Sequence, residues 1–231
     1  VLTQAAAEGR SKLSEPEAKQ VLKAYGVPVL ESRTARDPQG AAELAKGLTG
    51  PFALKILSPD ITHKSDVGGV ALNLGSPDEV RIAAEGMCAR IKAAAPTAKL
   101  DGFVLQQMAV RPHGRELIAG LSVDKVFGPV VLFGQGGVTV EVTADRAVGL
   151  PPLNRVLARD MIGRTRVSKL LAAYRDQPAA QLDQVADVLV GLSQLALDFP
   201  QIVEVDINPL SADDTGVLAL DARMRLADPG Q

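Results

Sequence analysis

The sequence lacks several residue types that mark common functional classes. Its 231 residues include one cysteine, Cys88, so neither an intrachain disulfide framework nor a cysteine-cluster zinc site is expected. Tryptophan is absent and aromatic residues make up 3% of the chain, which argues against a platform on which nucleic-acid bases stack. The formal net charge is −2, so no basic surface indicates binding to nucleic acid or to anionic lipid.

Long apolar runs and the commonest nucleotide-binding loops are missing as well. No run approaches membrane-spanning length, and no signal-peptide pattern opens the chain. Neither a GxxxxGK[ST] loop nor a GxGxxG sequence at a helix start occurs, which disfavours the two commonest nucleotide-binding folds. With 46% apolar and 23% charged residues, the composition is that of a globular protein, and a cytoplasmic location is the simplest expectation. The chain begins at Val1 and is compatible with a separate subunit or with a part of a longer polypeptide.

Helix and strand signals are interleaved along the chain. Ser14-Glu15-Pro16-Glu17 is a capping box and predicts a helix that ends at Gly26. Further helices are expected after Asp37-Pro38 and Ser76-Pro77, and over residues 154–174 and 180–198. Strands are expected over residues 52–57, 70–74, 102–108, 116–121 and 128–133. Hairpin-like strand pairs between helices favour an α+β fold with two sheet-bearing lobes over a doubly wound parallel sheet.

The most informative pattern lies near the C-terminus. Residues 202–209 and 218–223 are predicted to be two strands joined by a tight turn at residues 213–216. Because strand side chains alternate between faces, a turn centred between Asp214 and Thr215 fixes the pairs on one face. The expected cross-strand pairs are Asn208 with Asp221, Asp206 with Arg223, and Glu204 with Arg225.

Two of these pairs join opposite charges, which supports the register. The pair of Asn208 and Asp221 instead offers two oxygen ligands and no cation. A hard divalent metal such as magnesium, bound by one or two protein oxygens and by substrate phosphates, suits such a pair. A solvated hairpin face with two surface ion pairs explains the same residues, and at this point both interpretations are open.

Three residues of the first half of the chain have the chemistry to contact phosphate. Lys55 lies within an apolar strand, where an ammonium group favours an anionic partner, although its stem can also lie along the sheet with its head in water. His63 and Lys64 lie in a loop that ends with Gly68-Gly69, where glycines allow the backbone to approach a phosphate. An imidazole can act as a covalent nucleophile, and an ordinary surface histidine is equally compatible with the spacing.

A third group could form a seat for a nucleoside. Gln107 and Met108 end a predicted strand, and Glu116 begins the next one. Backbone amides beside a methionine suit an adenine ring, and a nearby carboxylate suits ribose hydroxyls. Spacing alone is weak support, since methionine is more often part of a core. The turn at residues 134–137 is compatible with close backbone packing or with an anion-binding nest.

In this order, these segments resemble the ATP-grasp domain of the NDP-forming acyl-CoA synthetases, a group related to the β chain of succinyl-CoA synthetase. The resemblance extends over nearly the whole chain from about residue 13, and the segments around His63 and Asn208 are the specific ones. The matching segments are residues 54–56, 63–70, 114–118, 127–131, 134–137, 204–210 and 220–223.

The resemblance implies a role for each matching residue. Lys55 corresponds to a lysine that contacts nucleotide phosphates, Gln107 and Met108 to the adenine hinge, and Glu116 to the acidic residue beside the ribose. Asn208 and Asp221 correspond to magnesium ligands, with Lys64 or Arg223 as further cations near the phosphates. His63 corresponds to a histidine that resembles a second phosphate carrier between the nucleotide and the CoA-binding part of ADP-forming acetyl-CoA synthetases.

One segment departs from the family pattern. Ala172-Ala173-Tyr174-Arg175-Asp176 stands where a glycine-rich Gly-Tyr-Arg-Gly sequence is expected, so no role is assigned to Arg175.

The fold implied by the resemblance is an ATP-grasp with nucleotide between two lobes. The expected smaller lobe comprises residues 31–103, and the larger lobe comprises residues 1–30 and 104–231 with the metal-binding hairpin. The implied enzyme is an acid–thiol ligase that interconverts acid, CoA and ATP with acyl-CoA, ADP and phosphate. This chain would bind ATP or ADP with Mg²⁺ and transfer the phosphoryl group to or from a phosphohistidine. Its partner would be a CoA-binding domain or α subunit, with no nucleic acid and no membrane involved. A regulatory nucleotide-binding module of a longer acetyltransferase fusion is the alternative, and no residue here indicates the acyl group.

Overall fold

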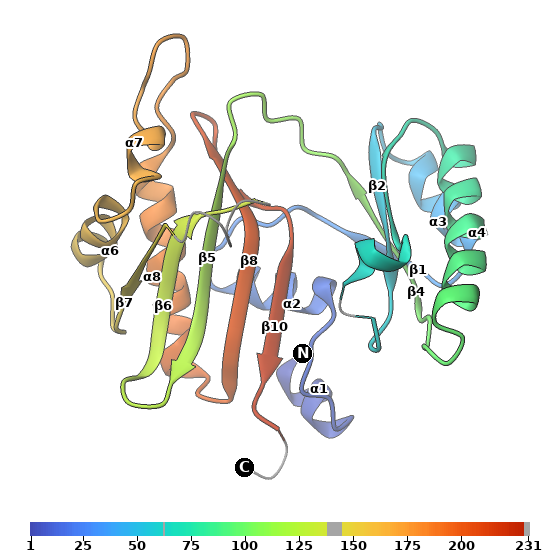
Figure 1. Ribbon diagram of the computed structural model, residues 1–231, viewed down its shortest axis with the longest axis horizontal. Coiled ribbons are helices and arrows are strands. Elements are labelled where there is room, and N and C mark those ends of the chain that lie inside the picture. Colours follow the sequence, from blue (N-terminus) through green and yellow to red (C-terminus); the bar gives the residue numbers. More distant parts are fainter. Residues whose placement is uncertain (62, 138–144, 229–231) are drawn as a thin grey trace. The chain divides into compact units, whose positions relative to one another are not determined.

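The structure is a computed structural model that describes residues 1–61, 63–137 and 145–228. The chain divides into two compact units (Figure 1). The smaller unit is Glu31–Val110, and the larger unit combines Val1–Leu30 with Arg111–Gln231. Each unit contains one sheet, and all the pairings between named strands are antiparallel. The predicted α+β class with two sheet-bearing parts is confirmed.

The smaller unit is a four-stranded sheet with the strand order β1-β4-β2-β3. Helices α3 and α4 lie side by side over one face of this sheet (Figure 1). Its elements are β1 (Arg33–Ala35), α3 (Pro38–Lys46), β2 (Phe52–Leu57), the 3₁₀ helix η1 (Lys64–Val67), β3 (Val70–Leu74), α4 (Pro77–Ala94) and β4 (Gly102–Gln107).

Local sequence signals explain why these elements begin where they do. The Asp37 carboxylate accepts a hydrogen bond of 2.7 Å from the Gly40 N–H, and the Ser76 hydroxyl accepts one of 3.2 Å from the Glu79 N–H. Each cap satisfies an N–H group that has no partner within the first helical turn. In β2, Leu54 and Ile56 are fully buried in the core beneath the helices. The alternation of side chains therefore turns Lys55 toward the opposite face.

The smaller unit extends beyond the expected range of 31–103. Strand β4 pairs along its whole length with β2, from Gly102 opposite Leu57 to Gln107 opposite Phe52. This pairing keeps residues 104–107 in the smaller unit, because cutting within β4 would divide a continuous ladder.

The larger unit is built on the sheet order β10-β8-β5-β6-β7, with the short β9 also paired to β8. Its elements are α1 (Leu2–Ala7), α2 (Glu15–Ala24), β5 (Arg115–Asp124), β6 (Gly128–Gln135), β7 (Arg146–Gly149), α6 (Arg155–Gly163), α7 (Ser168–Leu171), α8 (Leu182–Asp198), β8 (Ile202–Asp213), β9 (Gly216–Ala219) and β10 (Ala222–Leu226). Helix α8 packs against β5 and β6.

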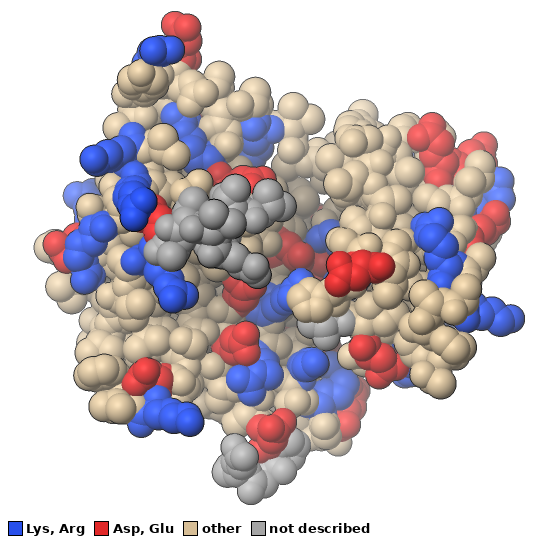
Figure 2. Space-filling model, in the orientation of Figure 1, with Lys and Arg blue, Asp and Glu red and all other residues tan. Residues whose placement is uncertain are grey.

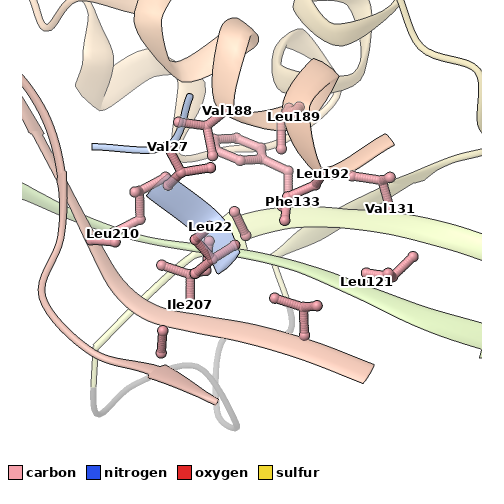
Figure 3. Close-up of a cluster of buried hydrophobic side chains, with 14 of the residues drawn as sticks. Leu22, Val27, Leu121, Val131, Phe133, Val188, Leu189, Leu192, Ile207 and Leu210 are labelled. Carbon is pink, nitrogen blue, oxygen red and sulfur yellow. The ribbon is translucent and has the colours of Figure 1, made fainter. Parts of the chain in front are cut away.

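The core of the larger unit lies between its sheet and helices α2 and α8 (Figure 3). Phe133 of β6 is fully buried and lies among Val188, Leu189 and Leu192 of α8. Leu22 of α2 is also fully buried in this cluster. Burial of each such side chain contributes about 1.5–3 kcal/mol, so this apolar contact is a main source of the unit's stability.

The predicted helix over residues 154–174 is wrong in extent. Helix α6 ends at Gly163, and the next helical segment, α7, begins only at Ser168. Between them, the Asp145 carboxylate accepts hydrogen bonds of 2.7 Å from the N–H groups of Arg166 and Val167. These two amides bond to a side chain that is distant in the sequence rather than to helical carbonyls, and no periodicity signals that contact.

The first thirty residues run along the C-terminal strands of the same unit. The Leu13 N–H donates to the Met224 carbonyl at 3.0 Å, and the Leu226 N–H donates to the Ser11 carbonyl at 2.7 Å. Farther along, the Leu30 N–H donates to the Ala219 carbonyl at 2.9 Å. The last residue before the smaller unit is therefore bonded to β9.

The first residue after the smaller unit, Arg111, is bonded to the turn between β8 and β9. Its guanidinium donates two hydrogen bonds to the Asp213 carboxylate, at 2.7 and 2.6 Å, and one of 2.9 Å to the Gly216 carbonyl. Burial raises the pKa of the Asp213 carboxyl, but the bonds from Arg111 and Thr215 outweigh it and leave that pKa well below its usual range. Both connections to the smaller unit are thus fastened to one hairpin.

On the surface, basic and acidic side chains are interspersed, as Figure 2 shows for one face. Several form pairs, such as the two-bond contact of Arg155 with Asp187 at 2.6 and 2.8 Å. In the part of the chain that the structure describes, no helix has both the length and the apolar character needed to cross a membrane.

Candidate functional site

The predicted register of the C-terminal hairpin is confirmed. Asp206 pairs with Arg223, and Glu204 pairs with Arg225, whose guanidinium lies 3.0 Å from the Glu204 carboxylate. Nearer the turn, β8 pairs with β9 in the same register, with Asp213 opposite Gly216. Val205 and Ile207 are buried on the other face, as the alternation predicts.

The two oxygen-bearing residues lie where the ladder is interrupted. Strand β9 ends at Ala219 and β10 begins at Ala222, so Asp221 lies between them. The Leu220 N–H donates to the Pro209 carbonyl at 3.0 Å, which carries the register across the break. Asn208 directly precedes Pro209 and Asp221 directly follows Leu220, so the register sets Asn208 and Asp221 opposite each other.

A glycine loop connects Asn208 to Glu116. The Gly137 N–H donates to Asn208 Oδ1 at 3.1 Å. A Cβ atom at Gly137 would lie 2.2 Å from Glu116 Oε2, so the Glu116 carboxylate passes directly over this residue. Residues 136–137 therefore bring Glu116 and Asn208 into one cluster, and the φ of 79° at Gly137 is a conformation that favours glycine.

The turn at residues 134–137 was compatible with close backbone packing or with an anion-binding nest, and the structure shows close packing at two of its glycines. A Cβ atom at Gly134 would lie 2.1 Å from the Asp145 carbonyl, and one at Gly136 would lie 2.3 Å from the Leu117 carbonyl. Close backbone packing accounts for both.

The hairpin face beside this cluster is rich in negative charge. Burial raises the pKa of the Asp206 carboxyl, the Arg223 guanidinium opposite it lowers that pKa, and the carboxylates of Asp221 and Glu204 raise it. Three carboxylates thus share one face with two arginines, Arg223 and Arg225.

The donor chemistry of Asn208 and Asp221 fits magnesium. An amide oxygen has two lone pairs, so Asn208 Oδ1 can accept the Gly137 N–H and still contact a cation. Among the described residues, no group of three or more His, Cys, Asp or Glu side chains is suited to a metal. A small protein ligand set completed by water and phosphate is the usual arrangement for Mg²⁺.

In the smaller unit, Lys55 and the loop of His63 and Lys64 are tied together through Gly69. The Ile56 N–H donates to the Gly69 carbonyl at 2.9 Å, and the Gly69 N–H donates to the Lys64 carbonyl at 2.7 Å. A Cβ atom at Gly69 would lie 2.6 Å from the Ile56 side chain, so glycine is needed for this close approach. The loop is therefore fixed to β2 beside Lys55, which is half-buried.

His63 is exposed and immediately precedes η1. The Gly68 residue that ends η1 has a left-handed conformation, with φ of 66°. Its carbonyl accepts hydrogen bonds of 3.3 and 3.1 Å from the Arg90 guanidinium on α4. Sequence analysis missed Arg90, because nothing in the local pattern connects α4 to a loop 22 residues earlier.

The residues expected at the adenine hinge lie at the end of β4. Gln107 is exposed, and the Met108 N–H donates to the Pro51 carbonyl at 2.8 Å. The Met108 sulfur accepts the N–H of Asn73 at 3.2 Å. Asn73 belongs to a bulged part of β3, with a positive φ of 59°.

Two groups of candidate residues result, one in each unit. The larger unit brings together Glu116, Asn208, Asp221 and Arg223, all on or beside β5, β8 and β10. The smaller unit carries Lys55, His63 and Lys64 on β2 and the loop before β3, and Gln107 and Met108 at the end of β4.

Comparison with known proteins identifies the family. A family model described as an ATP-grasp domain matches residues 4–226. The β subunit of acetate–CoA ligase [ADP-forming] I from Pyrococcus furiosus is 38% identical over 226 residues, which are 98% of this chain and 96% of that protein. Acetate–CoA ligase [ADP-forming] I from Archaeoglobus fulgidus is 37% identical over 208 residues, and there the match spans 90% of this chain but 30% of the relative.

A solved structure is similar over the whole chain. It is the dinucleotide forming acetyl-coenzyme A synthetase 1 of Ca. Korarchaeum cryptofilum, in complex with coenzyme A, Ca-AMPCP and HgCl⁺. The TM-score is 0.92 and the identity is 37%, with 98% of both chains covered. The chain therefore belongs to the ATP-grasp family, in the group that includes the β subunits of the ADP-forming acetate–CoA ligases.

Proposed function

We propose that this chain is the nucleotide-binding part of an ADP-forming acyl-CoA synthetase and transfers a phosphoryl group between ATP and a histidine. The observation that carries the proposal is the hairpin register on both sides of Asn208 and Asp221, which supports their opposition beside Glu116. The similar relatives are ADP-forming ligases, and the solved relative was bound to a nucleotide analogue with a divalent cation. A regulatory module of an acetyltransferase fusion has no support among them.

The proposed roles follow from the chemistry of each group. Asn208 and Asp221 would hold Mg²⁺, which when bound neutralises phosphate charge and orients the β- and γ-phosphates. Lys55 and Lys64 would donate charge-assisted hydrogen bonds to phosphate oxygens, and Arg223 would add a further cation. Glu116 would accept hydrogen bonds from ribose hydroxyls, and Gln107 with Met108 would border the adenine.

In the proposed reaction, an unprotonated imidazole nitrogen of His63 attacks the γ-phosphorus of ATP. A phosphorus–nitrogen bond forms while the bond from the γ-phosphorus to the bridging oxygen breaks, and ADP leaves with that oxygen. In the reverse direction, ADP accepts the phosphoryl group from phosphohistidine. An exposed residue at the start of a short turn is suited to exchange the group with a partner.

The complete reaction needs a second component under this proposal. The name of the Pyrococcus relative marks it as one subunit of an enzyme, and the Archaeoglobus relative is about three times as long as the matched region. We propose a CoA-binding domain or α subunit as the partner and a cytoplasmic setting, where ATP and CoA are available.

A titration of nucleotide tests the proposal directly. Calorimetry with ATP or ADP should give tight binding with Mg²⁺ and much weaker binding with EDTA. The chain alone should make no thioester from acid, CoA and ATP. Thioester should form once the partner is added. Equal affinity with and without metal would contradict the metal assignment, and thioester formation by the chain alone would contradict the need for a partner.

A further inference from the structure

Pro209 removes one hydrogen bond from the ladder beside the proposed metal residues. In an antiparallel hydrogen-bonded pair, two opposed residues exchange both N–H···O bonds. The Leu220 N–H donates to the Pro209 carbonyl at 3.0 Å. Proline has no N–H, so the reciprocal bond to the Leu220 carbonyl cannot form. That carbonyl needs a donor from elsewhere.

Lys19 of α2 supplies the donor. Its Nζ lies 2.9 Å from the Leu220 carbonyl oxygen, although the two residues are 201 positions apart in the chain. The ammonium also lies 3.0 Å from Glu15 Oε1, one helical turn earlier. The side chains of Lys19 and Glu15 are 3% and 2% exposed, so this arrangement is inside the larger unit.

Burying this ion pair has a desolvation cost, and such pairs are weak contributors to net stability. An apolar pair would fill the same space without that cost. What the ammonium adds is a directed, charge-assisted hydrogen bond to one backbone atom. That atom belongs to the residue directly before Asp221, at the break between β9 and β10.

The neighbouring residues are held from other directions. The Ala219 N–H donates to the Pro28 carbonyl at 2.8 Å, and the Ala222 N–H donates to Asp221 Oδ1 at 2.9 Å. Lys19 therefore bonds to Leu220, which lies between the fixed residues Ala219 and Ala222, at the position where Pro209 cannot donate a ladder hydrogen bond. The position of Asp221 opposite Asn208 depends on this part of the chain.

We infer that Lys19, paired with Glu15, is a positioning residue for the magnesium site: it replaces the bond that Pro209 cannot give and so holds Asp221 opposite Asn208. This inference rests on the proposed function, because it concerns the affinity of that same site for metal. Lys19 contacts neither nucleotide nor metal in this proposal. It acts through the Leu220 carbonyl.

The test removes the donor without leaving an unpaired buried charge. In the double variant Lys19→Met with Glu15→Gln, both side chains keep nearly their volume. Loss of groups that orient a metal ligand typically weakens metal binding by about 10- to 100-fold. We expect nucleotide affinity in Mg²⁺ to fall by about tenfold, at the lower end of that range, and affinity in EDTA to stay unchanged. Both are measured by calorimetry with a non-hydrolysable ATP analogue, alongside the thermal midpoint.

The same helix offers a matched control. Glu17 of α2 accepts two hydrogen bonds from Arg10, at 3.0 and 2.8 Å, and the other hydrogen bonds of this pair join Glu8, Lys12 and Ser14. The double variant Arg10→Met with Glu17→Gln should lower the thermal midpoint and leave the Mg²⁺ dependence as in wild type. If both double variants change stability alone, Lys19 is structural and the inference is wrong. If the wild type itself shows no Mg²⁺ dependence, the proposed metal site fails instead.

A measurement on the wild type covers the case in which the first variant does not fold. Amide hydrogen exchange of Leu220, followed without metal or nucleotide, reports whether its stretch is already held. We expect protection comparable to that of Ala219 and Ala222 on either side. Protection of Leu220 that arises only when Mg²⁺ and nucleotide are added would overturn the inference, because the metal would then be ordering the segment.

Discussion

Among the described residues, the buried charged side chains all belong to the larger unit, whereas the smaller unit buries one polar side chain, that of Gln106. The larger unit buries Glu15, Lys19, Arg115 and Asp213. Each of these groups bonds to backbone atoms or to a partner of opposite charge, and Lys19, Arg115 and Asp213 thereby fix a loop or a strand end. The charged candidate residues themselves are half-buried or exposed in both units, so the difference lies in the buried groups around them.

This difference matches the chemistry proposed for the two units. A metal site needs oxygen atoms held at fixed positions before the ion arrives, and buried polar bonds provide such positions at a desolvation cost. A phosphate carrier must instead meet two partners in turn, which suits the exposed His63. The larger unit is therefore expected to govern metal dependence, and the smaller unit to govern phosphate binding and transfer.

The largest expected effect concerns the carrier. His63→Ala removes the proposed nucleophile, so acyl-CoA synthesis with the partner present should fall by more than about 10³-fold, as for other covalent catalysts. Magnesium–nucleotide affinity should barely change. Steady-state turnover and calorimetry measure the two quantities.

His113→Ala is the matched control, because it removes the other histidine of the chain and lies in the larger unit. The Arg115 guanidinium bonds to the backbone carbonyl of His113, which this variant retains. Turnover that persists in His63→Ala would favour direct transfer from ATP to a histidine of the partner.

The next largest effect concerns the dependence of nucleotide affinity on Mg²⁺, which is assigned to the larger unit. Asp221→Ala removes one of two proposed protein ligands and should weaken nucleotide binding in Mg²⁺ by about 100-fold while leaving binding in EDTA unchanged. Asp214→Ala, an exposed change in the turn of the same hairpin, should have neither effect. A loss of affinity that is equal in Mg²⁺ and in EDTA would show that Asp221 does not act through a metal.

Lys55→Met should give the opposite pattern. It keeps the apolar stem on β2 and removes the charge, so affinity should fall in Mg²⁺ and in EDTA alike. A charge-assisted bond contributes about 1.5–3 kcal/mol, which corresponds to about 10- to 150-fold. Lys46→Met, on the exposed side of α3, is the control for loss of a positive charge. If the thermal midpoint falls and affinity does not, Lys55 has a structural role.

The smallest effect concerns stability in acid. Burial raises the pKa of Glu17, but hydrogen bonds from Arg10 and Ser14 outweigh it and bring that pKa to about 2. Asp213 is shifted in the same direction, and both residues lie in the larger unit. A carboxyl whose pKa is lower in the folded chain stabilises it above the unfolded pKa of about 4.3, and this contribution is lost as the pH falls toward the folded pKa.

We therefore expect the larger unit to lose stability before the smaller one as the pH falls from about 4.5 to about 2, by on the order of 1 kcal/mol for Glu17. Amide hydrogen exchange in β8 and β2 compares the two units. The double variant Arg10→Met with Glu17→Gln should show a smaller loss over this range. Equal loss in both strands of the wild type would remove the electrostatic difference between the units.

Much of the fold was predictable from local signals. The capped helices α2, α3 and α4 and the strands β2 and β3 were expected within a few residues, because caps, prolines and apolar periodicity act within one or two turns. The hairpin register was predictable because charge pairs and a turn determine it over a short separation. The break between α6 and α7 was not, since it depends on Asp145, some 20 residues away.

Site residues were predictable only where a local sequence pattern or the family resemblance indicated them. The bonds from Arg90 to Gly68 and from Lys19 to Leu220 cross 22 and 201 residues, and no periodicity reports them. Pro209 was a usable signal, however. A proline within a strand implies a carbonyl that has lost its donor, and so directs attention to whatever side chain supplies one.

The fastening of both inter-unit connections to the β8–β9 hairpin has a consequence for the order of folding. Residues 1–30 bond to strands near the C-terminus, so their partners do not exist until almost the whole chain has been synthesised. The smaller unit, by contrast, is one continuous segment whose sheet is complete at Gln107. It is therefore expected to fold first on the ribosome. Helix α2 can pack into the larger unit only after β9 and β10 have been synthesised.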